Sequence, residues 1–396
     1  MGLSRRRIDV GIPMDVVMEE ILTRLPAKSL MRFKCVSKRW SSLISSQYFK
    51  NRFLTVPSHP RRRIYMCLVD VRDKSYDVML SLSPDSTSSS FVVDHDRPIR
   101  RIRCFMHQNI GGFMCYSTFK KVRIFNPATR RLVTLPAAIE PIPAPPDEAA
   151  EKVVEYYFGH GPVSDQYTVV CSTGVYLNSP EWIRPIRSEA RVYVLKPGGG
   201  GSWKKVALTP PAFLPHIPAR GGVCIDEVIY YVGWTCTQIS MLVSFHIRSQ
   251  DLKTIQLPTR EDDANCMSKV SVIEYGGKAT IIDQTNLTDK GMLDLWDLDG
   301  KNKWSRKTLV VQPCQLHLVS NIDHGFMVKG TSQDGKVFLI PKALFSPFHI
   351  LSYDLRINDM RKIDIKGVPD HWFSKDKSAV KVMLVDDSES LVSLET

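Results

Sequence analysis

The hydrophobic pattern divides the chain into a short helical part and a long β part. Between Met14 and Leu25, apolar residues recur every three or four positions, as on one face of an amphipathic helix. Asp15 and Glu19 place negative charge toward the start of this segment, where a helix dipole favours it, and Pro26 limits its end. The spacing therefore predicts a helix over residues 14–25.

Two further helices are predicted directly after it, the first over residues 28–35. Ser37 is a good capping residue, and Trp40, Leu43 and Ile44 follow it at helical spacing. The apolar arc of the first helix covers roughly 140°, more than a helix facing only its own core needs. A bundle of about 40 residues is also near the lower limit for independent folding. We therefore expect a partner to cover part of this surface.

After Pro60 the pattern changes to short alternating apolar runs separated by Gly, Pro, Asn and Asp, which is typical of strands and turns. Five stretches share one form, an apolar strand, a polar turn and a second strand. Their aromatic anchors are separated by 68, 52, 51 and 57 residues, and they are Phe125, Tyr193, Phe245, Trp296 and Tyr353. The stretches are "RIFNPATRRLVTLP" (123–136), "VYVLKPGGGGSWKKVAL" (192–208), "SFHIRSQDLKTIQLP" (244–258), "LWDLDGKNKWSRKTL" (295–309) and "SYDLRINDMRKIDI" (352–365).

A period near 50 residues is typical of kelch-like blades of four strands that stack around an axis. The pattern predicts a small all-α N-terminal domain followed by an all-β domain, a six-bladed β-propeller, with seven blades as the alternative count. Residues 76–93 are an earlier, degenerate copy, and residues 379–394 supply strands that would pair with the first blade and close the ring. A two-sheet β-sandwich is the rival architecture, but the repetition favours the propeller.

One Pro/Ala-rich insertion, "LPAAIEPIPAPPDEAAEK" (135–152), interrupts the recurrence and explains the long step of 68 residues. Its prolines favour an extended loop over a strand. The alternatives for its role are a tolerated surface loop and a loop that contacts a partner.

The charge is unevenly distributed. Residues 1–63 contain fourteen Lys or Arg against four Asp or Glu, a net charge of +10, whereas residues 64–396 contain 39 against 37, only +2. The first part favours an acidic partner, and the second lacks a basic stripe that would form a groove for nucleic acid.

Targeting and redox features indicate the cytosol or nucleus. No apolar run approaches the roughly 18 residues of a membrane span, and the basic N-terminus lacks the apolar stretch of a secretory signal. The nine cysteines are scattered without a CxxC pair, so we expect reduced thiols.

Candidate catalytic and metal motifs are weak. "GGGG" (198–201) lacks the order of a phosphate-binding loop, so a hairpin tip is expected there. Cys104 and His107 have CxxH spacing, but no second pair appears at a structural-zinc distance. No GxSxG elbow is present, and the histidines form no recognisable relay with Ser or Cys. We therefore predict no catalytic residue, no metal and no cofactor.

The stretch "IPMDVVMEEILTRLPAKSLMRFKCVSKRWSSLISSQYF" (12–49) resembles the F-box, and the chain resembles the plant proteins in which an F-box precedes an F-box-associated domain. The resemblance implies a three-helix adaptor-binding domain over 8–54. Ile12 stands where the family usually has leucine, and Val16-Val17 where it often has a Leu-Leu pair. The positions that match the family's core and adaptor-contacting residues are Ile12, Pro13, Ile21, Leu22, Leu25, Pro26, Leu30, Phe33, Val36 and Trp40.

The resemblance continues over 60–396, which it identifies as an F-box-associated, kelch-like domain for substrate recognition. It rests on "IFNPATRRLVTLP", "YYFGHGPVSDQYTVVC" (156–171), "GGVCIDEVIYYVGW" (221–234) and "SFHIRSQDLKTI". These motifs are much less specific than the F-box.

The resemblance implies a substrate receptor of a Skp–cullin–F-box ubiquitin ligase, with no bond chemistry of its own. Its partners would be a Skp-type adaptor, through it a cullin scaffold, and a protein substrate that the sequence does not name. The alternatives are a propeller enzyme of galactose-oxidase-like architecture, disfavoured by the lack of a convergent metal or nucleophile set, and a basic nucleic-acid-binding protein. The latter is disfavoured because aromatic and basic residues do not alternate on the strands as a stacking platform needs.

Overall fold

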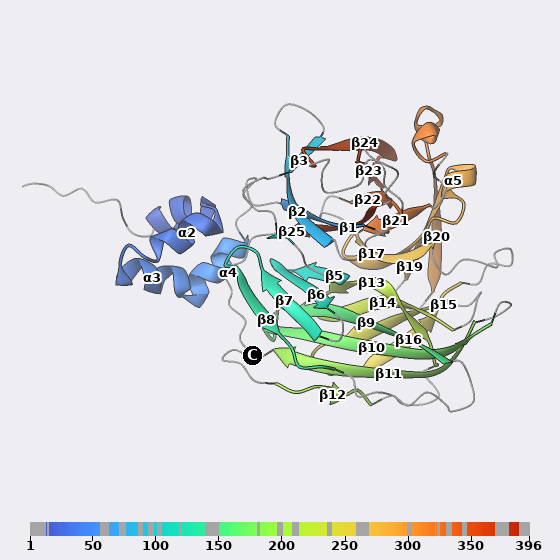
Figure 1. Cartoon of the computed structure of the whole chain (residues 1–396), viewed down its shortest axis with the longest axis horizontal. Coiled ribbons are helices and arrows are strands. Elements are labelled where there is room, and N and C mark those ends of the chain that lie inside the picture. The colour runs from blue at the N-terminus through green and yellow to red at the C-terminus, as the bar shows by residue number, and fades with distance from the viewer. Residues whose placement is uncertain are drawn as a thin grey trace, which may run out of the picture.

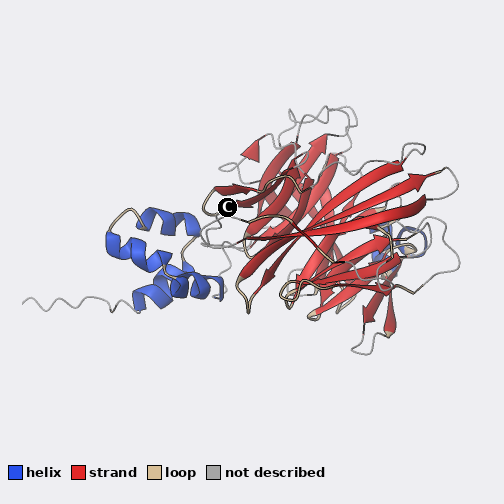
Figure 2. Ribbon diagram, turned by 90° about the horizontal axis from the view of Figure 1, so that it is seen from below, coloured by secondary structure: helices blue, strands red, loops and turns tan. Residues whose placement is uncertain are grey.

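The computed structural model shows a small helical domain at one end of a larger β domain (Figures 1 and 2). It describes residues 13, 16–55, 63–70, 77–85, 90–93, 99–100, 105–118, 121–138, 150–179, 183–195, 201–207, 214–235, 240–258, 269–298, 303–320, 322, 325–329, 335–342, 347–368 and 380–387.

The helical domain consists of short helical elements, and the first differs from the expected one. In place of one α-helix over 14–25, the described part is a π-helical turn followed by a 3₁₀ turn. The Leu22 N–H bonds the Val17 carbonyl, and the Thr23 hydroxyl donates to the Glu19 carbonyl at 2.5 Å, so the backbone repeat widens here and tightens again before Pro26. The elements are η1 (Val17–Ile21), η2 (Leu22–Arg24), α2 (Ala27–Phe33), α3 (Lys38–Ser45) and α4 (Gln47–Thr55).

The predicted second and third helices are confirmed, and a further one follows them. The Ser37 hydroxyl accepts a hydrogen bond from the Trp40 N–H at 3.2 Å, which caps α3 as expected. The helix α4 was not predicted from the periodicity. Its signal was the pair Phe49 and Phe53, four residues apart, whose rings are buried in the domain core.

The described strands of the β domain form five sheets. Four of them contain four antiparallel strands each. One consists of β5 (Phe105–Ile110), β6 (Phe113–Thr118), β7 (Lys121–Asn126) and β8 (Arg131–Thr134), and the next of β9 (Ala150–Gly161), β10 (Gln166–Asn178), β11 (Ile183–Leu195) and β12 (Lys204–Lys205). The third consists of β13 (Ile217–Ile225), β14 (Val228–Trp234), β15 (Ser240–His246) and β16 (Leu252–Gln256), and the fourth of β17 (Val270–Tyr275), β18 (Lys278–Asp283), β19 (Met292–Leu298) and β20 (Trp304–Val310).

The fifth sheet has nine strands. In spatial order they are β21 (Phe326–Lys329), β22 (Lys336–Pro341), β23 (His349–Asp354), β24 (Asp359–Lys366), β3 (Ser90–Val93), β2 (Asp77–Pro84), β1 (Arg63–Asp70) and β25 (Val380–Asp387), with β4 (Ile99–Arg100) beside β2. Two short helices lie in the loops, α5 (Leu287–Lys290) and η5 (Pro313–Leu318).

The β domain is a propeller, but with five blades among the described residues, so the predicted count of six, or alternatively seven, is wrong. The reason lies in the nine-stranded sheet, where β24 pairs in parallel with β3 through Asp364–Ser90, Ile365–Phe91 and Lys366–Val92. This pairing merges the last group of four strands with the first. The recurrence in the sequence reflects the number of strand groups. The number of sheets is one lower, because β24 and β3 are hydrogen-bonded to each other.

The predicted closure of the ring is confirmed. Strand β25 pairs antiparallel with β1 over eight residue pairs, from Arg63–Asp387 to Asp70–Val380. The C-terminal strand thereby covers an edge that β1 would otherwise expose.

The repeated sequence stretches are the last hairpins of successive strand groups. The five predicted strand–turn–strand units correspond to β7–β8, β11–β12, β15–β16, β19–β20 and β23–β24, and the degenerate copy at 76–93 is the hairpin β2–β3. A tryptophan recurs near the start of the second strand in two of these hairpins: Trp203 just before β12, and Trp304 at the start of β20. The indole N–H of Trp203 donates to Pro136 O and that of Trp304 to Gln256 O, each at 2.9 Å. Both carbonyls belong to the preceding group, so these tryptophans link neighbouring blades.

The long step of 68 residues has a second cause besides the insertion. Strands β9, β10 and β11 contain 12, 13 and 13 residues, about twice the length of most others. The last residues of the insertion, Ala150 to Lys152, belong to β9, so the expected extended loop is wrong for them. Residues 139–149 lie outside the described part of the chain, as does most of the predicted glycine hairpin tip at 198–201.

Candidate functional site

The helical domain has its own core. Buried apolar side chains from each of its elements except the π turn meet in one cluster, and their residues are Leu22, Ala27, Leu30, Ile44, Phe49 and Phe53. Met18 and Val17 of the π turn pack against this cluster and are half-buried. The domain therefore has a self-contained apolar interior of very small size.

Polar contacts fasten the π turn to the last helix. Glu19 accepts hydrogen bonds from Arg52 Nε at 2.6 Å and from the Tyr48 hydroxyl at 3.0 Å. These two donors, Arg52 above all, lower the pKa of the Glu19 carboxyl. The π turn, which begins the apolar face, is held in place by α4 at the far end of the domain sequence.

Several large apolar side chains of the domain point away from this core. The exposed fraction is 43% for Ile21, 36% for Phe33 and 67% for Val36. The Phe33 ring stacks on Trp40, with ring centroids 5.6 Å apart, so α2 and α3 present an aromatic pair beside Val36. Exposed valine, isoleucine and phenylalanine side chains on one small domain are typical of an interaction surface.

The ten residues predicted from the F-box resemblance differ in how far they are buried. Leu22 and Leu30 are buried in the domain core, so their first role is folding, and a substitution there tests stability rather than contact. Ile21, Phe33 and Val36 are the exposed members. Pro13 is exposed, Ile12 lies outside the described residues, and the half-buried members are Leu25, Pro26 and Trp40.

Among the described residues of this domain, two exposed large hydrophobic ones were absent from the predicted set. Val16 is 44% and Tyr48 61% exposed. Val16 precedes the π turn, and its signal was the Val16-Val17 pair already noted in the sequence. Tyr48 lies on α4, which the helical periodicity did not predict.

The β domain contains a largely buried polar cluster that joins several strands. His107 Nε2 lies 2.8 Å from Ser117 Oγ, while His107 Nδ1 lies 3.5 Å from Glu155 Oε2 and Arg220 Nε lies 3.1 Å from Glu155 Oε1. The order Ser–His–Glu is that of a hydrolase relay, but Ser117 is only 5% exposed. The cluster therefore connects β5, β6, β9 and β13 without offering a reachable nucleophile.

The contacts of His107 also bear on the predicted CxxH pair of Cys104 and His107. Both of its ring nitrogens have protein partners, and Cys104 lies outside the described residues. Among the side chains that the structure describes, no group of three or more His, Cys, Asp or Glu is arranged to hold a metal ion.

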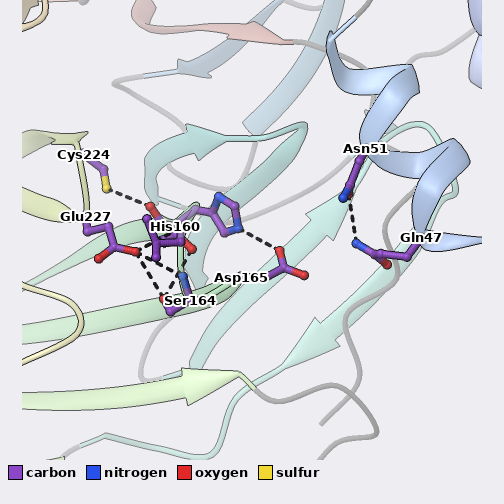
Figure 3. A network of polar contacts seen from close by, with 9 residues as sticks. Gln47, Asn51, His160, Ser164, Asp165, Cys224 and Glu227 are labelled. Atoms are coloured by element: carbon purple, nitrogen blue, oxygen red, sulfur yellow. Dashed lines mark hydrogen bonds and ion pairs between the residues drawn. The ribbon is translucent and has the colours of Figure 1, made fainter.

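A second polar network fixes two neighbouring hairpin turns of the β domain (Figure 3). Glu227 Oε1 accepts the backbone N–H groups of Val163 at 3.1 Å and Ser164 at 3.2 Å. Cys224 Sγ approaches His160 O at 3.6 Å. The β9–β10 turn is thus held rigidly against the β13–β14 turn, as suits a scaffold that presents loops.

Fold and surface together define a two-domain protein: a small helical domain with an exposed apolar face, joined to a β-propeller. Residues 14–52 match the F-box domain, and residues 63–388 match the F-box associated beta propeller domain. The chain belongs to the plant F-box proteins that carry an F-box associated β-propeller. Both matched ranges lie within the domains expected from the sequence, 8–54 and 60–396.

Relatives in Arabidopsis thaliana extend over nearly the whole chain. The F-box/LRR-repeat protein At2g40920 is 44% identical over 392 residues, covering 97% of this chain and 87% of the relative. The F-box protein At2g40925 is 42% identical over 398 residues, covering 98% and 94%. The F-box/kelch-repeat protein At4g19930 is 36% identical, covering 97% and 90%.

Similarity to solved structures is low. Regucalcin from Agrobacterium tumefaciens has a TM-score of 0.38 at 10% identity, covering 74% of this chain and 92% of that one, which is too distant to bear on function. Within the described residues, no helix is long and apolar enough to cross a membrane.

Proposed function

We propose that this chain is the substrate receptor of a Skp–cullin–F-box ubiquitin ligase, acting in the cytosol or nucleus. The F-box binds a Skp-type adaptor and through it the cullin scaffold, while the propeller binds the protein to be ubiquitylated. The receptor makes and breaks no bonds. It raises the effective concentration of the target's lysines near a ubiquitin-charged enzyme.

The observation that carries the adaptor role is the exposure of Ile21, Phe33 and Val36 on the helical domain. These side chains lie outside the buried core of the domain, which other residues fill. A partner that covers them gains free energy from apolar burial. The net charge of +10 over residues 1–63 adds attraction to an acidic partner surface.

The propeller suits the second role because its hairpin turns are held by buried polar contacts. Glu227 fixes one such pair of turns, and the blades are linked by tryptophan hydrogen bonds. A rigid scaffold with variable loops is the arrangement by which proteins select a partner. The loops of the propeller would determine which substrate binds and whether that substrate must carry a modification.

The adaptor role is tested with Val36→Glu. Val36 is 67% exposed, so burying the rest of its surface contributes about 1–2 kcal/mol. A carboxylate in the same dry contact adds several kcal/mol of desolvation cost. Binding to a purified Skp adaptor, measured by calorimetry, should weaken by at least about 30-fold.

The matched control is Val310→Glu on the propeller strand β20, which places the same side chain at a position that is 57% exposed. Circular dichroism should show both variants folded, and the control should bind the adaptor like the wild type. If folded Val36→Glu also binds at wild-type strength, Val36 lies outside the contact. If Phe33→Glu and Ile21→Glu behave likewise, the adaptor-binding proposal itself is wrong.

The enzyme and nucleic-acid alternatives receive no support from a particular observation. The described arrangement that resembles a catalytic relay, Ser117 with His107 and Glu155, is buried. The receptor function therefore stands as the one proposal.

A further inference from the structure

A cleft lies where the helical domain meets the propeller. One wall is the C-terminal part of α2 with Met31, Arg32 and Cys35, and the other is the β7–β8 turn from Pro127 to Arg130. Its volume is about 320 Å³, within the range of small-ligand sites. Figure 1 shows the helical domain beside this end of the propeller.

The positions of the two walls are fixed by apolar packing and by a tight turn. Ala128 packs against the core of the helical domain. Asn126 Oδ1 accepts the N–H groups of Ala128 at 2.9 Å and Thr129 at 3.1 Å, which sets the turn conformation. Arg130 follows with a left-handed backbone, φ 59°, and carries its side chain to the cleft. The cleft is thus a built feature of both domains.

Cations gather in and around this cleft. Arg32 and Arg130 stand on opposite walls, and none of the described residues that line the cleft is acidic. Lys50 and Arg131 are each close enough to Lys34 to affect its charge. The pKa of Lys34 is lowered, first by partial burial and then by the positive charges of Lys50 and Arg131. Two arginines therefore line the cleft, and the cationic residues Lys34 and Arg131 lie close to them in the sequence.

A second observation points to a polar ligand. Thr129 also lines the cleft, and its buried hydroxyl has no hydrogen-bond partner among the described residues. An unsatisfied buried hydroxyl is costly, and rotation about its Cα–Cβ bond changes the direction of this group. A ligand oxygen in the cleft would give it a partner.

We propose that this junction cleft binds a phosphate group through Arg32 of the F-box domain and Arg130 of the propeller. Paired guanidinium groups match the geometry and the double charge of a phosphate better than those of a single carboxylate. The bound group would join the two domains across their junction. The same chemistry is available from a free phosphate compound or from a phosphorylated residue of a protein.

Isothermal titration calorimetry on the full chain tests the site with three probes. They are inorganic pyrophosphate, a short peptide containing phosphoserine, and the same peptide with serine. Saturable binding of either phosphate probe, without binding of the serine peptide, is the expected result. Tighter binding of pyrophosphate assigns a free phosphate compound as the source, whereas tighter binding of the phosphopeptide assigns a protein-borne group. Absence of binding by both phosphate probes at millimolar concentration overturns the proposal.

Three substitutions locate the binding. Arg32→Gln and Arg130→Asn remove one guanidinium each, and asparagine tolerates the left-handed backbone of position 130. Each should weaken pyrophosphate binding by about ten-fold or more. The control Arg39→Gln removes an exposed arginine of the same domain from α3, outside the cleft lining, and should weaken it less than about two-fold.

Equal losses in Arg39→Gln and Arg32→Gln would mean diffuse charge attraction and would refute the cleft as the site. So would wild-type binding by both cleft variants, once circular dichroism shows them folded. Because neither the adaptor nor a substrate enters these measurements, the result is independent of the proposed ligase function.

Discussion

Acid should destabilise the propeller through one buried histidine, His216. Its side chain is fully buried, with Nδ1 at 3.2 Å from Leu214 O and Nε2 at 3.3 Å from the Tyr231 hydroxyl. A carbonyl only accepts, so Nδ1 carries the proton of the neutral ring and Nε2 faces the hydroxyl. Burial lowers the pKa of His216 from 6.5 to about 4.

The sign and size of the effect follow from this shift. The unfolded chain binds a proton on His216 near pH 6.5, whereas the folded chain does not until about pH 4. The contribution of neutral His216 to the free energy of unfolding is therefore fully present above pH 6.5 and is lost as the pH drops from there to about 4. The slope approaches 1.4 kcal/mol per pH unit, which amounts to about 2 kcal/mol between pH 7 and pH 5.

The measurement is urea unfolding at several pH values for the wild type and for His216→Phe, which removes the titrating ring. The His216-dependent loss should be absent from the variant, so the free energy of unfolding of the wild type minus that of the variant should fall by about 2 kcal/mol between pH 7 and pH 5. His349, whose pKa is also lowered by burial, remains in both proteins and cancels in the difference. Parallel curves for the two proteins over this range would show that His216 titrates normally in the folded state, and the reasoning from its burial would be wrong.

Two further substitutions test stability in other parts of the molecule. Leu30→Ala should cost the helical domain about 2–5 kcal/mol, because Leu30 is fully buried in its small core; hydrogen exchange should quicken for helical-domain amides and not for propeller strands. Trp304→Phe removes the indole donor to Gln256 O and should lower propeller stability by about 1 kcal/mol in urea unfolding, and an unchanged midpoint would mean that this link between blades is energetically neutral.

The local features of this fold could be predicted from the sequence because each depends on neighbouring residues. Ser37 caps α3 by bonding a backbone N–H three residues ahead, and the strand–turn–strand stretches form hairpins from residues next to one another. Periodicity and turn residues carry this information directly.

What could not be predicted depends on contacts between distant segments. The pairing of Ile365 with Phe91 merges two strand groups, and no local pattern distinguishes that junction from an ordinary gap between blades. The π turn at Val17–Ile21 likewise depends on Glu19, which is held by Arg52 thirty-three residues later.

The same limit applies to the candidate site. The F-box pattern found the right segment, but Leu22 and Ile21 are adjacent apolar residues, and only the fold shows that the first is buried and the second exposed. The junction cleft could not be predicted from the sequence, because Arg32 and Arg130 come together only when the two domains meet.

The pairing of β1 with β25 has a consequence for synthesis. Strand β1 ends at Asp70 and its partner begins at Val380, so the ribosome must add about 310 residues before the ring can close. At roughly 5–20 residues per second this takes about 15–60 s, during which the F-box has already emerged and the β1 edge is open. A nascent chain therefore displays its helical domain well before its propeller is complete. Any product that stops short of β25 keeps the open edge as a lasting mark of incompleteness, one that chaperones and proteases can recognise.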